Sequence, residues 1–232
     1  MLRGVDLSLE PGARCLLVGA NGAGKTTLLR VIAGKHMVDQ RAVRVLGRPA
    51  FHDTSLARRC VFIGGVFPLD VDLTVDEILA SSDCDAARRD ELVEVLDVDK
   101  RWHMHRVSDG QRRRVQILLG LLNDPEVLLL DEVTTDLDLL GRADLLAFLA
   151  RESEQRGLTV LYASHILDRL EAWSTHLAHM RAGRIVRFLD ATQITAEPGY
   201  GDGDASIAPL VRLVEKWLRD EKASRLEAET AG

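Results

Sequence analysis

Almost wholly apolar runs alternate along the chain with longer stretches in which apolar residues recur at helical spacing. Residues 13–18, 127–130 and 159–163 form three such runs, each of strand length. Continuous apolar runs of this kind are typical of strands that are buried on both faces of a parallel sheet. Helical spacing follows the first run over residues 27–33 and separates the other two over residues 139–154. The pattern therefore predicts an α/β fold with a mostly parallel core sheet.

Shorter patterns outside these runs predict a small antiparallel β portion, an inserted helical subdomain and a C-terminal helix. The short strand-like segments are 5–9, 42–46, 60–63, and the hairpin 176–180 with 185–189. The pattern becomes helical from Leu73 to about Leu122, and the Gly- and Asp-rich stretch 195–205 resembles a linker before an amphipathic helix over 207–226. The predicted units are the first part of the core, 1–65, the helical subdomain, 66–124, the second part of the core, 125–194, and the linker with its helix, 195–232.

Composition shows an ordinary globular chain with no global affinity for polyanions. Of 232 residues, 46% are apolar and 28% are charged, and the formal net charge is −6. These values exclude a disordered chain and a disulfide scaffold, and they argue against direct nucleic-acid binding. The cysteines, Cys15, Cys60 and Cys84, lack metal-ligand spacing and are expected to be free thiols. Since no stretch approaches the roughly 18 apolar residues of a membrane helix, we expect a cytoplasmic protein that could also enter the nucleus.

A glycine-rich loop stands between the first apolar run and the first helical stretch, and it fits the phosphate-binding loop pattern in full. Glycines let successive backbone N–H groups approach phosphate oxygens, and the following helix presents its positive N-terminal end to the same anion. Lys25 is expected to meet the β- and γ-phosphates, and Thr26 to bind Mg²⁺. The predicted nucleotide-binding residues are Gly19, Ala20, Asn21, Gly22, Ala23, Gly24, Lys25, Thr26 and Thr27.

Two acids, Asp131 and Glu132, directly follow the apolar run 127–130. Ligands of open α/β sheets bind at the carboxyl ends of the strands. Asp131 is therefore expected to hold Mg²⁺ through water, and Glu132 to take a proton from the attacking water. Acids are also common at strand ends because these ends meet solvent, but a full phosphate loop elsewhere favours the functional interpretation.

Four motifs together resemble the ABC-type ATPases: the loop 19–26, the acid pair, Val107-Ser108-Asp109-Gly110-Gln111, and Tyr162-Ala163-Ser164-His165. The resemblance covers roughly residues 2–190. It implies that Ser108, Gly110 and Gln111 belong to the signature segment, that 134–138 is the D-loop, and that His165 is the switch histidine that meets the γ-phosphate. It also implies an ATP-dependent head-to-tail dimer of two copies, or of this chain with a related ATPase, in which each ATP lies between one loop and the other signature segment.

The sequence departs from the family pattern at three places. No glutamine lies between Gln40 and Gln111, so Gly64-Gly65 stands where the family has a glutamine that touches Mg²⁺ and senses a transport domain. Asp109 replaces a glycine of the signature and is expected to point away from the phosphate or to pair with a local arginine. The first aromatic is Phe51, so the opening strand and its base-stacking aromatic are expected to be missing from the sequence as given.

The segment from Ser108 to Gln116 is similar to that of a small eukaryotic subgroup of soluble ABC ATPases, the plant-type ABC I group together with a factor associated with the carbon-catabolite-repression Not complex. This resemblance implies an ATPase switch that regulates a protein complex in transcription or mRNA turnover. Two alternatives stay open, namely a transport subunit that drives a separate membrane permease and a catalytically idle ATP-dependent interaction module.

Residues outside these motifs are expected to be structural or solvated. The cluster Arg112–Arg114 is favoured as a solvated or intramolecular cluster over a nucleic-acid patch. The remaining histidines have no functional constellation in the sequence: His36, His52, His103, His105, His176 and His179.

Overall fold

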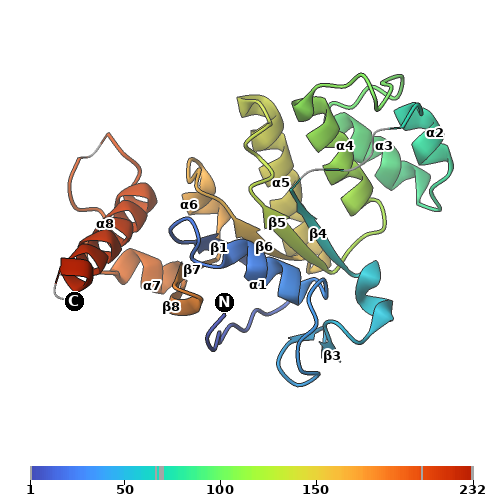
Figure 1. The fold of residues 1–232 in the computed structure, drawn as a ribbon. Helices are drawn as coiled ribbons and strands as arrows, with labels where there is room; N and C mark the ends of the chain where they lie inside the picture. The colour runs from blue at the N-terminus through green and yellow to red at the C-terminus, as the bar shows by residue number, and fades with distance from the viewer. Residues whose placement is uncertain (1, 66, 68–70, 205, 231–232) are drawn as a thin grey trace.

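The core of the molecule is a six-stranded sheet with the strand order β4-β5-β6-β1-β7-β8 (Figure 1). The computed structural model describes residues 2–65, 67, 71–204 and 206–230. Neighbouring strands are parallel except for the last pair, a β7–β8 hairpin. The strands of this sheet are β1 (Arg14–Val18), β4 (Cys60–Gly64), β5 (Val127–Asp131), β6 (Thr159–Ala163), β7 (His176–Arg181) and β8 (Arg184–Asp190). The predicted α/β fold with a mostly parallel sheet is confirmed.

Helices flank this sheet, and a group of three, α2, α3 and α4, forms a lobe beside the β4 edge (Figure 1). A small two-stranded antiparallel sheet, β2 (Arg44–Val45) with β3 (Arg48–Pro49), follows α1 in the chain, and a 3-10 turn at Thr54–Ala57 leads into β4. The helices are α1 (Lys25–Ile32), α2 (Val75–Ala80), α3 (Ala86–Val95), α4 (Asp109–Leu121), α5 (Leu139–Arg156), α6 (Leu170–Trp173), α7 (Ala191–Ala196) and α8 (Pro209–Thr230).

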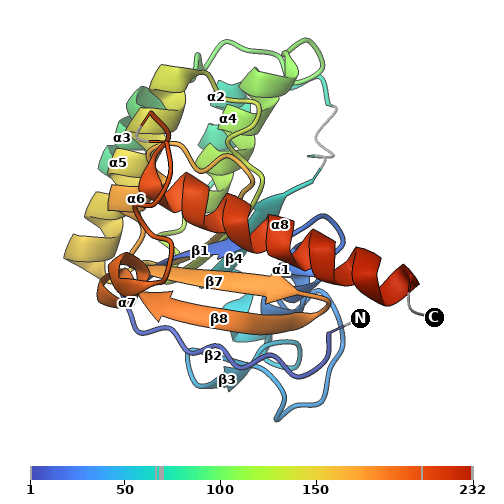
Figure 2. The same ribbon diagram turned by 90° about the vertical axis from the view of Figure 1, so that its left-hand side faces the viewer.

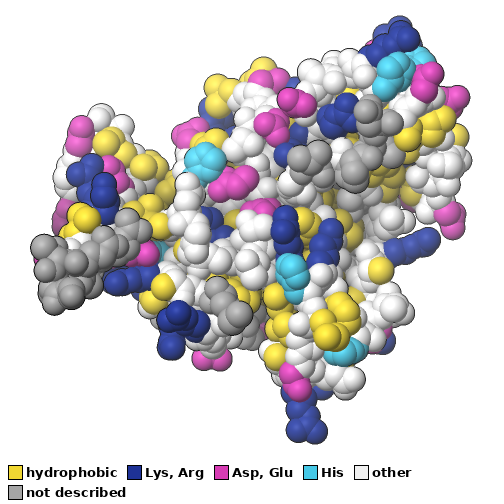
Figure 3. Space-filling model, viewed as in Figure 1, with side chains coloured by type: hydrophobic (Ala, Val, Ile, Leu, Met, Phe, Trp, Pro, Cys, Tyr) yellow, Lys and Arg dark blue, Asp and Glu magenta, His cyan; other side chains and the backbone are white. Residues whose placement is uncertain are grey.

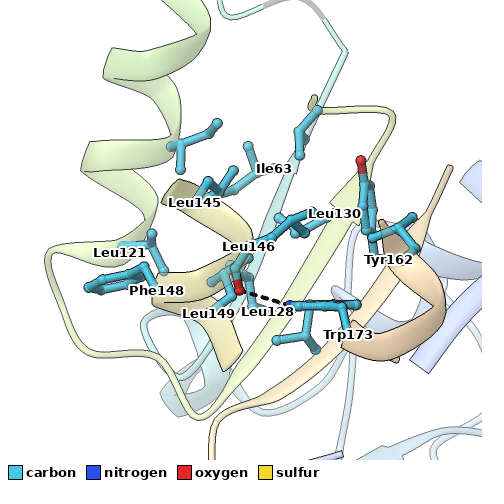
Figure 4. Packing of buried hydrophobic residues seen from close by; sticks show 14 of the residues in the cluster. Ile63, Leu121, Leu128, Leu130, Leu145, Leu146, Phe148, Leu149, Tyr162 and Trp173 are labelled. Atoms are coloured by element: carbon cyan, nitrogen blue, oxygen red, sulfur yellow. Dashed lines mark hydrogen bonds between the residues drawn. The ribbon is translucent and has the colours of Figure 1, made fainter. Parts of the chain in front are cut away.

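Side chains that alternate along the central strands enter two separate hydrophobic clusters. Leu16 of β1 packs in one cluster, together with α5 and α4, whereas the next residue, Leu17, packs in the other with α1. Successive strand side chains point to opposite faces, so the central strands need apolar residues at nearly every position. Figure 4 shows the first cluster, in which the buried Trp173 also donates an indole N–H to the carbonyl of Leu146 at 2.9 Å. The central strands β1, β5 and β6 are therefore buried on both faces, whereas the edge strand β8 is more exposed.

One buried arginine contributes to the junction between the helical lobe and the core. Arg88 of α3 pairs with Glu152 of α5 at 2.7 Å and with Asp124 at 3.3 Å, and its Nε donates to the carbonyl of Leu121. Both Arg88 and Glu152 have side chains only 7% exposed. Removing one partner of a buried pair leaves the other charge unsatisfied, which typically costs roughly 3–5 kcal/mol. This network fixes α3 and α4, and hence the signature segment, relative to α5.

The N-terminal segment differs from its strand-like pattern. Residues 5–9 are assigned to no strand, although Val5, Leu7 and Leu9 are half-buried against the cluster that contains α1. Among the backbone bonds of this segment, Arg3 N donates to the carbonyl of Gly183 at 2.8 Å. The alternating pattern therefore corresponds to an extended segment with one side half-buried. Alternation of this kind does not by itself require pairing with a neighbouring strand.

The C-terminal region also differs from its prediction at one end. The expected linker begins inside a helix, since α7 occupies Ala191–Ala196 and is closed at its start by a capping box between Asp190 and Gln193. The long helix α8 lies against β7 (Figure 2), where Trp217 stacks on the ring of His179 with centroids 5.2 Å apart. Its apolar face is buried against the core of the same chain: Leu210, Leu213, Val214 and Trp217 are buried, and Leu218 is partly buried.

Candidate functional site

The glycine-rich loop after β1 has a backbone that only glycine accommodates at two positions. Gly24 has φ +110°, and a Cβ there would lie 2.9 Å from the methyl group of Met180. A Cβ at Gly19 would collide with the carbonyl oxygen of Met180. The loop thus packs directly on the end of β7, and α1 begins immediately after it at Lys25. This close packing holds the N-terminus of α1 at the carboxyl edge of the sheet, as the motif predicted.

The two polar side chains that open α1 face the acids that end β5. Lys25 Nζ donates to the carbonyl oxygens of Gly19 at 2.7 Å and Ala20 at 3.3 Å. Thr26 Oγ1 donates to Asp131 Oδ1 at 3.2 Å. Burial lowers the pKa of Lys25 and raises the pKa of Asp131, with the Thr26 hydroxyl partly opposing the second shift. Both groups are therefore partly desolvated charges that a ligand of opposite charge would stabilise.

These residues line a polar cavity of about 280 Å³. The cavity has space for phosphate groups and a hydrated cation, and it offers backbone N–H groups, one ammonium, hydroxyls and two carboxylates. Hydroxyl and carboxylate oxygens are the ligands that Mg²⁺ prefers. Its lining residues are Asn21, Gly22, Gly24, Lys25, Thr26, Thr27, Asp131 and Glu132.

Glu132 and His165 meet at the mouth of this cavity, although 33 residues separate them. The ring Nδ1 of His165 lies 2.7 Å from Glu132 Oε2, and the backbone N–H of His165 donates to the same oxygen at 3.3 Å. Glu132 has φ +54°, in the left-handed region, and its N–H donates to the carbonyl of Ala163. Such a conformation in a non-glycine residue costs energy and is concentrated at functional sites. The parallel pairing of β5 with β6 brings the two motifs together.

The signature segment lies apart from the residues that line the cavity. Ser108 is the N-cap of α4: its Oγ accepts from the N–H of Gln111 at 3.3 Å, and the Gln111 side chain accepts from the N–H of Ser108 at 2.9 Å. A Cβ at Gly110 would lie 2.7 Å from the carbonyl oxygen of Asp136, so the first turn of α4 touches the D-loop. Asp109 is exposed in that first turn, where the helix dipole favours a negative charge.

The arginines that follow the signature segment make contacts that the sequence did not specify. Arg113 pairs with Asp136 at 3.0 Å, and Arg114 pairs with Asp97 at 2.7 Å and Asp138 at 2.6 Å. These contacts agree with the predicted intramolecular interpretation of this cluster. On the face seen in Figure 3, the described Lys and Arg side chains are interspersed with Asp and Glu.

A histidine cluster on the helical lobe adds contacts of His103 and His105 that the sequence did not specify, and both residues are solvent-exposed as expected. Both rings place Nδ1 next to Asp72 Oδ1, at 3.2 Å and 3.1 Å. Arg106 Nε donates to Nε2 of His105 at 2.8 Å, which leaves the ring proton on the Nδ1 that faces Asp72. The three side chains therefore form a hydrogen-bonded cluster on the surface. The antiparallel bridge between Thr74 and His103 creates it, and no local sequence signal reveals such a bridge.

Comparison with known proteins identifies relatives along nearly the whole chain. The family described as "ABC transporter" matches residues 2–135. ABC transporter I family member 20 of Arabidopsis thaliana is 46% identical over 236 residues, which cover 96% of this chain and 70% of that protein. CCR4-associated factor 16 of Saccharomyces cerevisiae is 41% identical over 206 residues, which cover 80% and 71%.

A solved structure of a dimeric ATP-binding cassette, bound to ADP and Pi in a post-hydrolysis state, has the same fold. The TM-score is 0.69 at 21% identity, over 82% of this chain and 90% of that chain. Within the part of the chain that the structure describes, no helix combines the length and apolar character needed to cross a bilayer.

Proposed function

Since this chain belongs to the ABC transporter family and is an ABC-type ATP hydrolase, we propose that it acts as a regulatory switch for a protein complex in the cytoplasm. In this proposal two copies close around ATP, and hydrolysis lets them open again. The observation that carries the chemistry is the convergence of Lys25, Thr26, Asp131 and Glu132 on one polar cavity.

We assign separate roles to the residues of this cavity. The ammonium of Lys25, held by two loop carbonyls, is placed to pair with the β- and γ-phosphates, while the loop N–H groups and the N-terminus of α1 meet the remaining charge. Glu132 accepts the proton of the attacking water on its carboxylate. His165 contacts that carboxylate through Nδ1 and so orients it, beside its expected role toward the γ-phosphate.

The adjacent oxygens of Thr26 and Asp131 fit a magnesium ion, with Asp131 acting through water. When bound, Mg²⁺ would neutralise charge on the phosphate oxygens. The raised pKa of Asp131 supports this assignment, because a carboxylate that is partly desolvated gains from a nearby cation. Mg²⁺ dependence of turnover is the corresponding measurement.

A head-to-tail dimer is supported by the position of the signature segment, which does not reach the phosphate cavity of its own chain. Ser108, Gly110 and Gln111 lie outside the set of residues that line the phosphate cavity. A second copy would have to bring its own signature segment to the γ-phosphate side of this cavity. ATP-dependent dimerisation is therefore part of the proposal.

The regulatory role rests on the end of β4. Gly64 pairs with Asp131 in the sheet, and a Cβ at Gly64 would lie 2.6 Å from the Cβ of Asp131. Neither Gly64 nor Gly65 has a side chain with which to report the state of the nucleotide to a docked permease. The similarity to CCR4-associated factor 16, a protein named for its association with another factor, also favours a protein-complex role.

A transport subunit is the second candidate, and one observation favours it. A groove of about 340 Å³ lies between β4 and α4, and it could receive a permease segment. Its lining residues are Lys35, Val61, Phe62, Ile63, Gly64, Phe67, Gln116, Leu119 and Gly120. Stoichiometric co-purification of the full chain with a polytopic membrane protein would favour this candidate, whereas co-purification with proteins of the soluble fraction would support the switch.

The catalytic part of the proposal is tested by Glu132→Gln. We expect ATP binding to stay intact while turnover falls at least about a hundredfold, the low end of general-base contributions. A stable ATP-bound dimer should then accumulate, which size-exclusion chromatography with light scattering would detect. The matched control is Glu126→Gln, at an exposed carboxylate just before β5 that pairs with Arg59. Near-normal turnover of Glu132→Gln would overturn the assignment of Glu132 as the base.

A further inference from the structure

The guanidinium of Arg113 joins three parts of the molecule that are distant in sequence. Its Nε donates to Asp136 of the D-loop at 3.0 Å, and its Nη1 donates to the backbone carbonyl of Gly65 after β4, also at 3.0 Å. Nη1 also bonds to Gln116, one turn further along α4. One side chain therefore connects the signature helix, the end of β4 and the D-loop.

The D-loop end of this connection continues to the proposed base. Thr135, the neighbour of Asp136, donates its hydroxyl to the backbone carbonyl of Glu132 at 2.9 Å. On the other side, the carbonyl of Asp136 packs so closely on α4 that only glycine fits at position 110. The backbone of the D-loop is thus held between the base and the first turn of α4, and Arg113 is the charged contact across that junction.

The chemistry of this junction requires an arginine. The Arg113 side chain is 14% exposed and that of Asp136 is 35% exposed, so the pair is partly shielded from water. A guanidinium presents several N–H donors in one rigid plane, and here they reach a carboxylate and a carbonyl from two different elements. A lysine ammonium also has several donors, but they lie on one nitrogen at the end of a flexible stem, so they do not reproduce the fixed spacing between the Nε and Nη1 contacts. The backbone carbonyl of Gly65 needs no side chain at that position.

We propose that Arg113 is a positioning residue for ATP hydrolysis, which locks the D-loop to α4 and to the end of β4 so that the signature segment and Glu132 move as one unit. This inference rests on the proposed function, because it assumes hydrolysis at the cavity that contains Glu132. Arg113 thereby connects the end of β4 to the D-loop, at a place where Gly64 and Gly65 have no side chain of their own to do so. Arg113 is not among the residues that line the cavity, so it acts through the carboxylate of Asp136 and the backbone carbonyl of Gly65 that it holds.

The test is a double-mutant cycle of Arg113→Gln, Asp136→Asn and the combination of both. Either single change should lower kcat roughly tenfold or more while the affinity of the monomer for ATP stays within about twofold, since small misplacements of catalytic groups can cost up to about a hundredfold in rate. The double variant should be no slower than Arg113→Gln, because Arg113→Gln already removes the contact with Asp136. Arg113→Lys should recover only part of the loss.

Controls separate positioning from simple loss of folding. Gln116→Ala removes the partner of Arg113 that lies on the same helix, and it should leave kcat within about twofold. Thermal unfolding of every variant reports whether the chain folds, and ATP binding reports whether the cavity is intact. A purely structural role would lower stability and ATP affinity together, without the selective fall in kcat.

Three outcomes would overturn the inference: unchanged kcat in folded Arg113→Gln, additive effects in the double variant, or a kcat loss that stability alone explains. The proposed function would fail on a different result, namely that the unmodified chain shows no ATP turnover that depends on Glu132. If the unmodified chain and Arg113→Gln hydrolyse ATP equally, the ATPase proposal stands and the role of Arg113 falls.

Discussion

The phosphate-binding loop and the signature segment are both short turns that lead into a helix, but their helices begin in different ways. α1 begins after Gly24, a left-handed residue that gives no side-chain cap. α4 begins after Ser108, whose side chain and that of Gln111 form a complete capping box. The first N–H groups of any helix need partners, and a helix without a side-chain cap leaves them for a ligand. The N-terminus of α1 can therefore bind phosphate within a single chain, whereas backbone N–H donors at the start of α4 already have partners in the capping box.

This difference agrees with the lining of the phosphate cavity, which includes residues at the N-terminus of α1 and none of the signature segment. At α4 the Ser108 hydroxyl accepts a hydrogen bond from Gln111 but keeps its own proton to donate. A phosphate from another copy could receive that proton without breaking the cap. We therefore expect ATP to bind at the N-terminus of α1 first, and this binding should persist when residues at the N-terminus of α4 are changed.

The largest effect should come from removing the charge at α1. We expect Lys25→Ala to raise the Kd for ATP at least about a hundredfold, because the β- and γ-phosphates would then meet backbone dipoles alone. Isothermal titration calorimetry is the measurement. The matched control is Lys35→Ala, since Lys35 lies over the ring of Phe62 at 4.8 Å and outside the cavity. Unchanged affinity in Lys25→Ala would contradict the role of this loop.

A change of pH acts on a third place, His179 of β7, which lies outside the residues that line the phosphate cavity. Burial and the nearby Arg187 and Arg181 lower the pKa of His179 to about 4 from 6.5. The unfolded chain then binds more protons than the folded chain between these values, so stability is present above pH 6.5 and is lost as the pH falls toward 4. Glu221 Oε2 lies 3.6 Å from Nε2 of this ring.

From pH 7 to pH 5 this difference lowers the free energy of unfolding by roughly 2 kcal/mol. Denaturant unfolding at the two pH values measures it, and the stacking of Trp217 on His179 places this pH dependence where α8 docks on β7. His179→Phe should keep the stack and remove this part of the pH dependence. If His179→Phe loses as much stability between pH 7 and pH 5 as the unmodified chain does, the acid sensitivity belongs to other groups.

The sequence predicts the α1 half of the site better than the α4 half for a physical reason. The loop motif is local, since its backbone, its lysine and its threonine are all specified within residues 19–26. The acids follow from their place at the end of a buried strand, and the parallel order of β5 and β6 then brings His165 to Glu132. Contacts such as Arg113 with Asp136 cross 23 residues and depend on how α4 packs. No periodicity encodes such contacts.

Secondary structure shows the same limit. Residues 5–9 alternate as a strand does, yet pairing depends on a neighbouring strand edge that the pattern cannot specify. The capping box of α7 is readable in the sequence as Asp190 followed three residues later by Gln193, although a glycine-rich stretch begins shortly after it. Element type was therefore predicted well where burial enforces it, and less well at the surface.

The smallest expected effect sharpens the comparison directly. Ser108→Ala should leave ATP binding to the monomer unchanged, because α1 does not depend on α4. It should weaken ATP-dependent dimerisation of the Glu132→Gln background by about tenfold, the equivalent of one lost hydrogen bond of roughly 1.4 kcal/mol. Loss of the cap alone should cost about 1 kcal/mol of stability.

Thr74→Ala is the matched control, since Thr74 and Glu77 form the same capping box at α2, with Thr74 Oγ1 accepting from Glu77 N at 3.2 Å. Both variants should lose similar stability, whereas only Ser108→Ala should weaken the dimer, as measured by sedimentation at a series of ATP concentrations. Equal dimerisation of the two variants would mean that the α4 terminus gives no hydrogen bond to the nucleotide, and the contrast between the two helices would then have no functional meaning.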